Sequence, residues 1–337
     1  MPNTISKFSK YIEKLDLVYQ LASCTSLLDS DSSLVKAGAN ANELVIPKLT
    51  MDALADYSRS NGYASGDVTF TNETVTFNYD RGRRFNVDNM DNEESAGLAF
   101  GRLAAEFIRT KSTPELDAFR FATYAAAQGI NVKSGTLSTG ENVISEIVTA
   151  TSVMDDAEVS PENRVLFITP TLYNSAMNVN TTVSKDILNG FSKIVKVPQS
   201  RFYTAIDMAD GITEDEKAGG YKRAAAHYEL TTTSPDDWST NAAGYFTLSG
   251  GVYTPVSGSP SWEAGKYYKK ASEEGKNINF MIIEKSSVIQ FPKHTVNKVV
   301  TPEENQTSDS WLFFFRAYGL ADSYENRRSG IYLHHAV

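Results

Sequence analysis

The stretch from Asp67 to Asp88, DVTFTNETVTFNYDRGRRFNVD, decides the fold class of this chain. Apolar residues alternate with Thr and Asn along its first half, which is the periodicity of a half-buried β-strand. The polar pair Asn72-Glu73 predicts a turn between two strands of a β-hairpin. The apolar face of this hairpin comprises Val68, Phe70, Val75 and Phe77.

A hairpin is stable only when its apolar face packs against a sheet or another partner, and the next predicted element along the chain is a helix. We therefore expect this face to pack against a neighbouring copy of the chain. The basic run at its end, Arg81, Arg83 and Arg84, is expected to form ion pairs across the same boundary, because guanidinium groups bind carboxylates with two hydrogen bonds. The carboxylates available on a neighbouring copy, or on the same chain, are Asp88, Asp91, Glu93 and Glu94.

Two other interpretations of the basic run are a solvated turn and a patch that binds nucleic acid. The net charge of −9, from 32 basic and 41 acidic residues, argues against a dedicated nucleic-acid-binding protein. Cys24 is the one cysteine, which excludes an intramolecular disulfide and a cysteine-based zinc site. No apolar run reaches the roughly 20 residues of a membrane span, and the first residues lack a signal-peptide pattern.

No motif in the chain nominates a catalytic, cofactor-binding or metal-binding residue. The adjacent His334 and His335 would point in opposite directions on a strand, and no cysteine or nearby histidine completes a metal site. The sequence contains no nucleophile-elbow pattern and no glycine spacing of a phosphate-binding loop. We expect a protein that is not an enzyme.

The order of predicted elements indicates an α+β fold. Amphipathic patterns predict helices over 4–22, 91–111, 113–129 and 141–157, and apolar runs predict strands over 44–49, 165–169, 194–197, 202–206, 278–283, 294–300, 311–318 and 330–333. Residues 228–272 differ from the rest, because aromatic residues are spread among Thr, Ser, Gly and Pro. We expect a small all-β module there, with a core of Trp238, Tyr245, Trp262 and Tyr267; sugar stacking by these rings is the alternative.

This order of elements resembles the major capsid protein of tailed phages, with the Hong Kong 97-type fold. The local matches are the segment from Asn277 to Ile289, the ending Gly319-Leu320-Ala321-Asp322 followed by Ser329 to Tyr332, and Val165 to Pro170 with Leu172-Tyr173. The resemblance implies an N-terminal arm (1–42), an extended loop (43–90), a spine helix with the peripheral domain (91–134), an axial domain (135–227), the inserted module (228–272) and returning strands (273–337).

The resemblance also implies a function. It predicts a structural subunit that self-assembles into hexamers and pentamers around double-stranded DNA, which it contacts without sequence preference. The subunit would be assembled in the host bacterial cytoplasm and located in the virion, with separate scaffold, portal or decoration proteins as further partners and no membrane or cofactor. The alternatives are an encapsulin-like nanocompartment shell and a surface adhesin or carbohydrate-binding protein. Some family members cross-link through a lysine in the extended loop, but Arg59 to Asp88 contains none.

Overall fold

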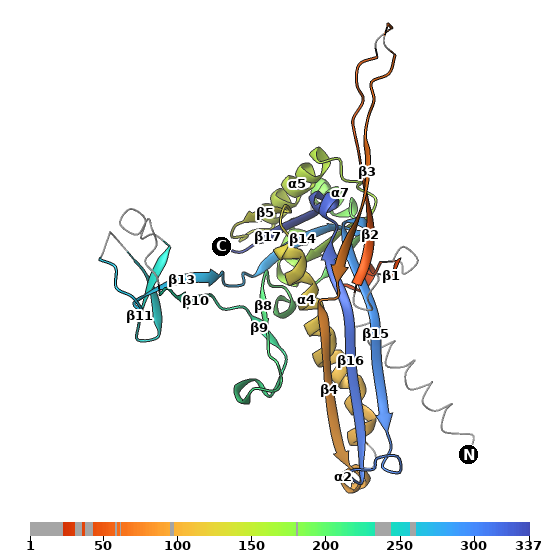
Figure 1. Cartoon of the computed structure of the whole chain (residues 1–337), viewed down its shortest axis with the longest axis vertical. Helices are drawn as coiled ribbons and strands as arrows, with labels where there is room; N and C mark the ends of the chain where they lie inside the picture. Colours follow the sequence, from red (N-terminus) through yellow and green to blue (C-terminus); the bar gives the residue numbers. More distant parts are fainter. Residues whose placement is uncertain are drawn as a thin grey trace, which may run out of the picture. The chain divides into compact units, whose positions relative to one another are not determined.

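The computed structural model describes residues 23–30, 36–37, 43–57, 59–60, 62–94, 98–179, 181–232, 244–256 and 261–337. The chain divides into two compact units, and Figure 1 shows their elements. Unit 1 comprises Met1–Thr110 and Ser286–Glu325, and unit 2 comprises Lys111–Lys285 and Asn326–Val337. The predicted helix over 4–22 and the predicted core residue Trp238 lie outside the described residues.

The main sheet of unit 1 has the strand order β15-β16-β4, and all its pairs are antiparallel. Its strands are β15 (Val288–Val300), β16 (Ser310–Ser323) and β4 (Tyr79–Asp88). Helix α3 (Leu98–Phe107) packs on one face, where the Phe107 ring lies 4.8 Å from Phe85 and 5.5 Å from Phe315. The mixed α and β content that the sequence predicts is confirmed.

Helix α2 (Asn89–Glu94) begins directly after β4. The Met90 amide donates a hydrogen bond of 2.9 Å to the Asp88 carboxylate. The helical region predicted to begin near Asp91 begins two residues earlier, at Asn89, because Asp88 satisfies an amide of the first turn.

A second sheet of unit 1 has the order β1-β2-β3, and its strand β3 takes up most of the residues that were predicted to form both strands of a hairpin. Its strands are β1 (Lys36–Ala37), β2 (Glu43–Met51) and β3 (Val68–Thr76). The predicted turn at Asn72-Glu73 is wrong, since β3 runs through both residues and Asn72 pairs with Pro47 of β2. Neither residue has the positive φ of a tight hairpin turn, and the Thr-rich sequence around them favours a strand. We call the paired β2 and β3 the ribbon.

The base of the ribbon packs within its own unit. Leu44 and Val75 are buried against Ile289 and Leu320. Phe77 joins this cluster and stacks on Tyr318 at 5.0 Å. The prediction that Val75 and Phe77 lack a partner in their own chain is therefore wrong. The partner strands β15 and β16 lie more than 200 residues further along the sequence, so local pattern reading missed them.

The segment before the ribbon is joined to β15. Its 3₁₀ turn η1 (Ser26–Leu28) buries Leu28 fully. The buried Gln290 side chain donates hydrogen bonds to the Thr25 carbonyl (2.8 Å) and to the Asp29 carboxylate (2.6 Å). These contacts fix residues 25–29 on the sheet edge.

Unit 2 is built on a five-stranded sheet in the order β5-β17-β14-β6-β7. The strands are β5 (Asn131–Ser134), β17 (Ile331–His335), β14 (Ile278–Glu284), β6 (Arg164–Ile168) and β7 (Lys193–Lys196). Helices α5 (Gly140–Asp156), α6 (Pro170–Asn178) and α7 (Thr182–Asn189) share an apolar core with one face. The strands predicted at 165–169, 278–283 and 330–333 and the helix at 141–157 are confirmed.

The other face of this sheet carries α4 (Thr113–Ala126), which follows the π-helical turn η3 (Ile108–Ser112). The Phe121 ring of α4 lies 5.2 Å from Phe167 and 4.8 Å from Phe202. Pro114 lies in the first turn of α4, as the sequence predicts.

The remaining short turns are η4 (Gln199–Arg201), η5 (Glu214–Glu216), η6 (Lys285–Ser287) and η7 (Glu325–Gly330). Strands β8 (Ile206–Met208) and β9 (Tyr221–Arg223) form a small hairpin. The strand predicted over 202–206 is wrong, because the Phe202 amide donates to the Gln199 carbonyl and closes η4 there. A four-stranded sheet, in the order β10-β13-β11-β12, contains β10 (His227–Leu230), β11 (Tyr245–Ser249), β12 (Val252–Pro255) and β13 (Tyr267–Ser272).

Candidate assembly surfaces

The outer part of the ribbon exposes a continuous apolar stripe. In the β2–β3 register Leu49 lies opposite Phe70, and Met51 lies opposite Val68. Residues that pair directly, and residues two apart on one strand, share a face. All four side chains are therefore on one face, and each is at least half exposed, Phe70 at 65%. We call Leu49, Met51, Val68 and Phe70 the ribbon stripe.

The ribbon stripe lies on the opposite face from the buried base. Leu44 pairs with Val75, and this pair is an odd number of residues away from the pair of Leu49 and Phe70. The apolar face thus changes sides along the ribbon. Because each fully buried Leu, Met, Val or Phe side chain stabilises by about 1.5–3 kcal/mol, an exposed stripe of four is a strong candidate for contact with another molecule.

The loop that joins the two strands of the ribbon, over 52–67, also exposes apolar and aromatic side chains. Leu54 is fully exposed, and Tyr63 is nearly so. The Tyr57 and Tyr63 rings contact each other edge to face at 4.9 Å. The Asp67 amide donates a hydrogen bond of 2.8 Å to the Asp52 carboxylate, which closes the end of the strand pair.

The three predicted arginines lie in the middle of β4 and not at the tip of a hairpin. Arg81 pairs with Ala317, Arg83 with Phe315 and Arg84 with Phe314. Arg81 and Arg83 therefore share the face of Phe85, on which α3 packs, and both are half-buried. Arg84 is exposed on the opposite, open face. The sequence predicts one basic cluster, and strand geometry divides it between two faces.

On the open face Arg316 of β16 forms an ion pair with Asp80 of β4 within the same chain. Its guanidinium donates two hydrogen bonds to the Asp80 carboxylate, from Nε at 2.8 Å and from Nη2 at 2.6 Å. These hydrogen bonds hold the pKa of Asp80 below its ordinary value. Both side chains are about half exposed, so water screens the pair.

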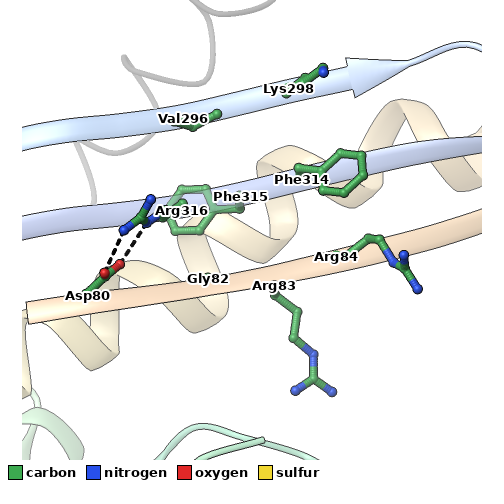
Figure 2. A pocket seen from close by; sticks show the side chains of 9 residues that line it. All are labelled: Asp80, Gly82, Arg83, Arg84, Val296, Lys298, Phe314, Phe315 and Arg316. Carbon is green, nitrogen blue, oxygen red and sulfur yellow. Dashed lines mark hydrogen bonds and ion pairs between the residues drawn. The ribbon is translucent and has the colours of Figure 1, made fainter. Parts of the chain in front are cut away.

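Next to this ion pair the open face has a shallow hollow of about 550 Å³ (Figure 2). Its lining includes Gly82, Arg84, Val296, Lys298, Phe314 and Arg316. Lys298, Phe314 and Arg84 are directly opposite one another on the three strands. Figure 2 shows the two cations on the outer strands and the Phe314 ring on the strand between them.

The hollow depends on the absence of a side chain at residue 82. A Cβ added to Gly82 would come within 2.9 Å of the Phe315 carbonyl oxygen, closer than real side chains approach. Glycine therefore allows the close pairing of β4 and β16 at this point.

The predicted carboxylate partners lie at and after the far end of β4. Asp88 is exposed and caps α2. Glu93 and Glu94 lie in α2, and their side chains are outside what the structure describes.

The three predicted core residues of the 228–272 region that the structure describes come together. Tyr267 is almost fully buried, with Tyr245, Trp262 and Val256 packed against it. The Trp262 ring stacks on Tyr267 at 5.4 Å, and the Tyr267 hydroxyl donates to the Ser261 carbonyl at 3.1 Å.

The opposite face of this four-stranded sheet carries a second set of aromatic rings. Tyr228 stacks on Tyr253 at 4.0 Å and meets Phe246 edge to face at 4.8 Å. Tyr268 lies 5.2 Å from Tyr253. All four rings are half-buried.

His334, one of the two adjacent histidines, is enclosed in unit 2. It is 1% exposed, and its Nδ1 lies 3.0 Å from the Asn279 amide nitrogen. Since that amide also donates to the Gly135 carbonyl, its nitrogen is the donor and His334 Nδ1 is the acceptor. Burial lowers the pKa of His334.

Among the described residues no group of three His, Cys, Asp or Glu side chains is placed to hold a metal ion. The helices of the described part of the chain are all too short or too polar to cross a membrane.

Sequence reasoning missed Leu49, Met51, Lys298 and Arg316. Leu49 ends the strand predicted over 44–49 but was not assigned to a surface, and a strand prediction two residues longer would have included Met51. Lys298 and Arg316 join the surface only through pairing of distant strands, for which the sequence carries no local signal.

No family model and no curated protein matches the sequence. The structure is similar to the capsid structure of the cyanophage P-SCSP1u, with a TM-score of 0.50 and 11% identity over 90% of this chain and 85% of that chain. A chain from the structure of the head fiber and inner core protein gp22 of native bacteriophage P68 is also similar. Its TM-score is 0.51, with 10% identity over 93% of this chain and 84% of that chain.

At this identity the likeness is one of fold. It covers 90% of this chain in one comparison and 93% in the other. The chain therefore has the Hong Kong 97-type fold of tailed-phage capsid proteins.

Proposed function

We propose that this chain is the structural subunit of an icosahedral phage capsid, which self-assembles into hexamers and pentamers around double-stranded DNA. The observation that carries the proposal is the ribbon stripe, whose four apolar side chains are exposed in the isolated subunit. An exposed stripe on a two-stranded ribbon is costly unless another copy covers it. The shared fold supports a shell as that assembly.

In this proposal the ribbon of one subunit lies on its neighbour and buries Leu49, Met51, Val68 and Phe70. Val75 and Phe77 hold the ribbon to its own subunit. Arg81, Arg83 and Arg84 pair with carboxylates at subunit boundaries. The protein has no catalytic task, it is located in the virion, and it contacts DNA through phosphates without reading bases. Separate scaffold, portal or decoration proteins complete the particle.

The test is electron microscopy of the purified protein over a range of concentrations. We expect closed particles with hexameric and pentameric capsomers, and nuclease-protected DNA when they are isolated from infected cells. A protein that stays monomeric at every concentration and salt would contradict the proposal. Closed particles that contain a protein cargo and no DNA would indicate a nanocompartment shell instead.

A further inference from the structure

The hollow on the open face of the β15-β16-β4 sheet combines two cations with an apolar floor. Arg84 and Lys298 are exposed, and neither forms an ion pair with any residue that the structure describes. Their strands lie about 10 Å apart, two strand spacings. Between them Phe314 and Val296 are half-buried, while Arg316 is already paired with Asp80. The hollow therefore suits a ligand with an apolar group and carboxylates beside it.

The loop between β8 and β9 presents such a group. Ile212 is 83% exposed. Asp215 forms no ion pair within the described part of the chain. Glu214 forms one long ion pair, in which its carboxylate lies 3.6 Å from the Lys217 ammonium, and both side chains are largely exposed. Over Asp210–Lys217 the loop has four carboxylates and one lysine.

This loop is held in one conformation by its own hydrogen bonds. The Asp210 carboxylate accepts from the amides of Ile212 (2.7 Å) and Thr213 (2.9 Å) and from the Thr213 hydroxyl (2.5 Å). The Asp210 amide donates to Glu216 at 2.9 Å. A preorganised loop loses little conformational entropy on binding, which favours it as a recognition element.

We propose that the hollow of one subunit binds the Asp210–Lys217 loop of a second copy of this chain. Ile212 covers Phe314 and Val296, and the carboxylates of Glu214 and Asp215 pair with Arg84 and Lys298. The two surfaces are different patches on every copy, so the contact is head to tail, and contacts of this kind generate rings when the rotation between copies closes. The inference rests on the proposed shell function and names one interface within its rings.

Charge reversal on both sides tests the contact. Arg84→Glu with Lys298→Glu, and separately Glu214→Lys with Asp215→Lys, should raise the protein concentration needed for shell assembly by about tenfold, because like charges then face each other. All four changed residues are exposed, so each subunit should keep the thermal stability of the unchanged protein. Combining all four substitutions should restore assembly.

A matched control separates pairing from net charge. Glu141→Lys with Asp156→Lys makes the same charge change at exposed positions of α5, and it should not restore the Arg84→Glu, Lys298→Glu protein. Three outcomes would each overturn the inference while leaving the shell function intact. They are rescue by this control, rescue by Asp56→Lys in the ribbon loop, and normal assembly of either charge-reversed protein. An unchanged protein that never assembles would contradict both the inference and the shell function.

Discussion

Leu49 lies directly opposite Phe70 in the ribbon, and both side chains are at least half exposed. Five residues back along β2, Leu44 lies opposite Val75, and both are buried. The odd spacing places the two pairs on opposite faces. One face holds the ribbon to its own subunit, and the other is exposed and can contact a second molecule. Mutations can therefore change subunit stability and intermolecular contact separately.

Replacing the ribbon stripe should block assembly without unfolding the subunit. We expect Leu49→Ser with Phe70→Ser to abolish particles while the free energy of unfolding changes by less than about 0.5 kcal/mol per site, because the side chains are exposed. Light scattering reports assembly, and denaturant titration of the unassembled subunit reports stability.

The control for this prediction is Thr50→Ser with Thr69→Ser, which changes the neighbouring pair on the other face of the ribbon. It should assemble normally. Val75→Ser should behave differently from both, costing about 2–4 kcal/mol of subunit stability, because it places a hydroxyl in a buried apolar cluster. Normal particles from the Leu49→Ser, Phe70→Ser protein would rule out the stripe as an interface.

Gly82 should tolerate no side chain. We expect Gly82→Ala to lower the free energy of unfolding by about 1–3 kcal/mol, since its Cβ would meet the Phe315 carbonyl at 2.9 Å and both strands would have to shift. Gly66→Ala is the matched control, because the nearest atom to its Cβ would be 3.7 Å away, an ordinary contact. Equal stability of the two variants in thermal unfolding would show that β4 and β16 separate without cost.

The Asp80–Arg316 pair should contribute little, and its contribution should depend on pH. The pKa of Asp80 is below its ordinary value of 3.8 in the folded chain, so the pair stabilises above that value and loses its effect as the pH falls through the lowered pKa. Because both groups are about half exposed, Asp80→Asn should cost at most about 1 kcal/mol at pH 7.

The measurement is the difference in unfolding free energy between Asp80→Asn and the unchanged protein, from pH 7 down to pH 3. The difference should shrink toward the acid end, and 1 M salt should reduce it at pH 7. A difference that grows on acidification would mean that the ion pair does not stabilise the sheet.

Sequence patterns predicted those helices and strands that can be identified from the spacing of apolar residues within their own segment. Helix α5 and strands β6, β14 and β17 lie within two residues of their predicted bounds, since the helix has its core positions at helical spacing and each strand has them in one apolar run. The patterns also located the aromatic residues that surround Tyr267. They indicated that Val68 and Phe70 belong to a strand with an apolar face.

The patterns failed where a distant strand decides the outcome. The turn at Asn72-Glu73 was predicted because β2 was not recognised as the partner of β3. Arg81, Arg83 and Arg84 were grouped as one cluster because consecutive residues look adjacent in a sequence, whereas a strand sends them to alternate faces. The hollow needs Lys298 and Arg316 from strands more than 200 residues away, so sequence alone could not predict it.

Unit 2 should lose stability on mild acidification through His334. Its pKa is lowered by burial, so the folded chain holds the ring neutral while the unfolded chain binds a proton near the ordinary pKa of 6.5. The stability that this group contributes is therefore complete above pH 6.5 and falls as the pH drops from 6.5 toward the lowered pKa. A proton on Nδ1 would also remove the acceptor for the Asn279 amide.

His334→Gln tests this prediction, because it keeps a side-chain acceptor and cannot take up a proton. We expect the unchanged protein to lose more unfolding free energy than the Gln variant between pH 7 and pH 5, and hydrogen exchange of the β17 amides should accelerate in parallel. Equal losses in the two proteins over this range would show that another group controls the acid response.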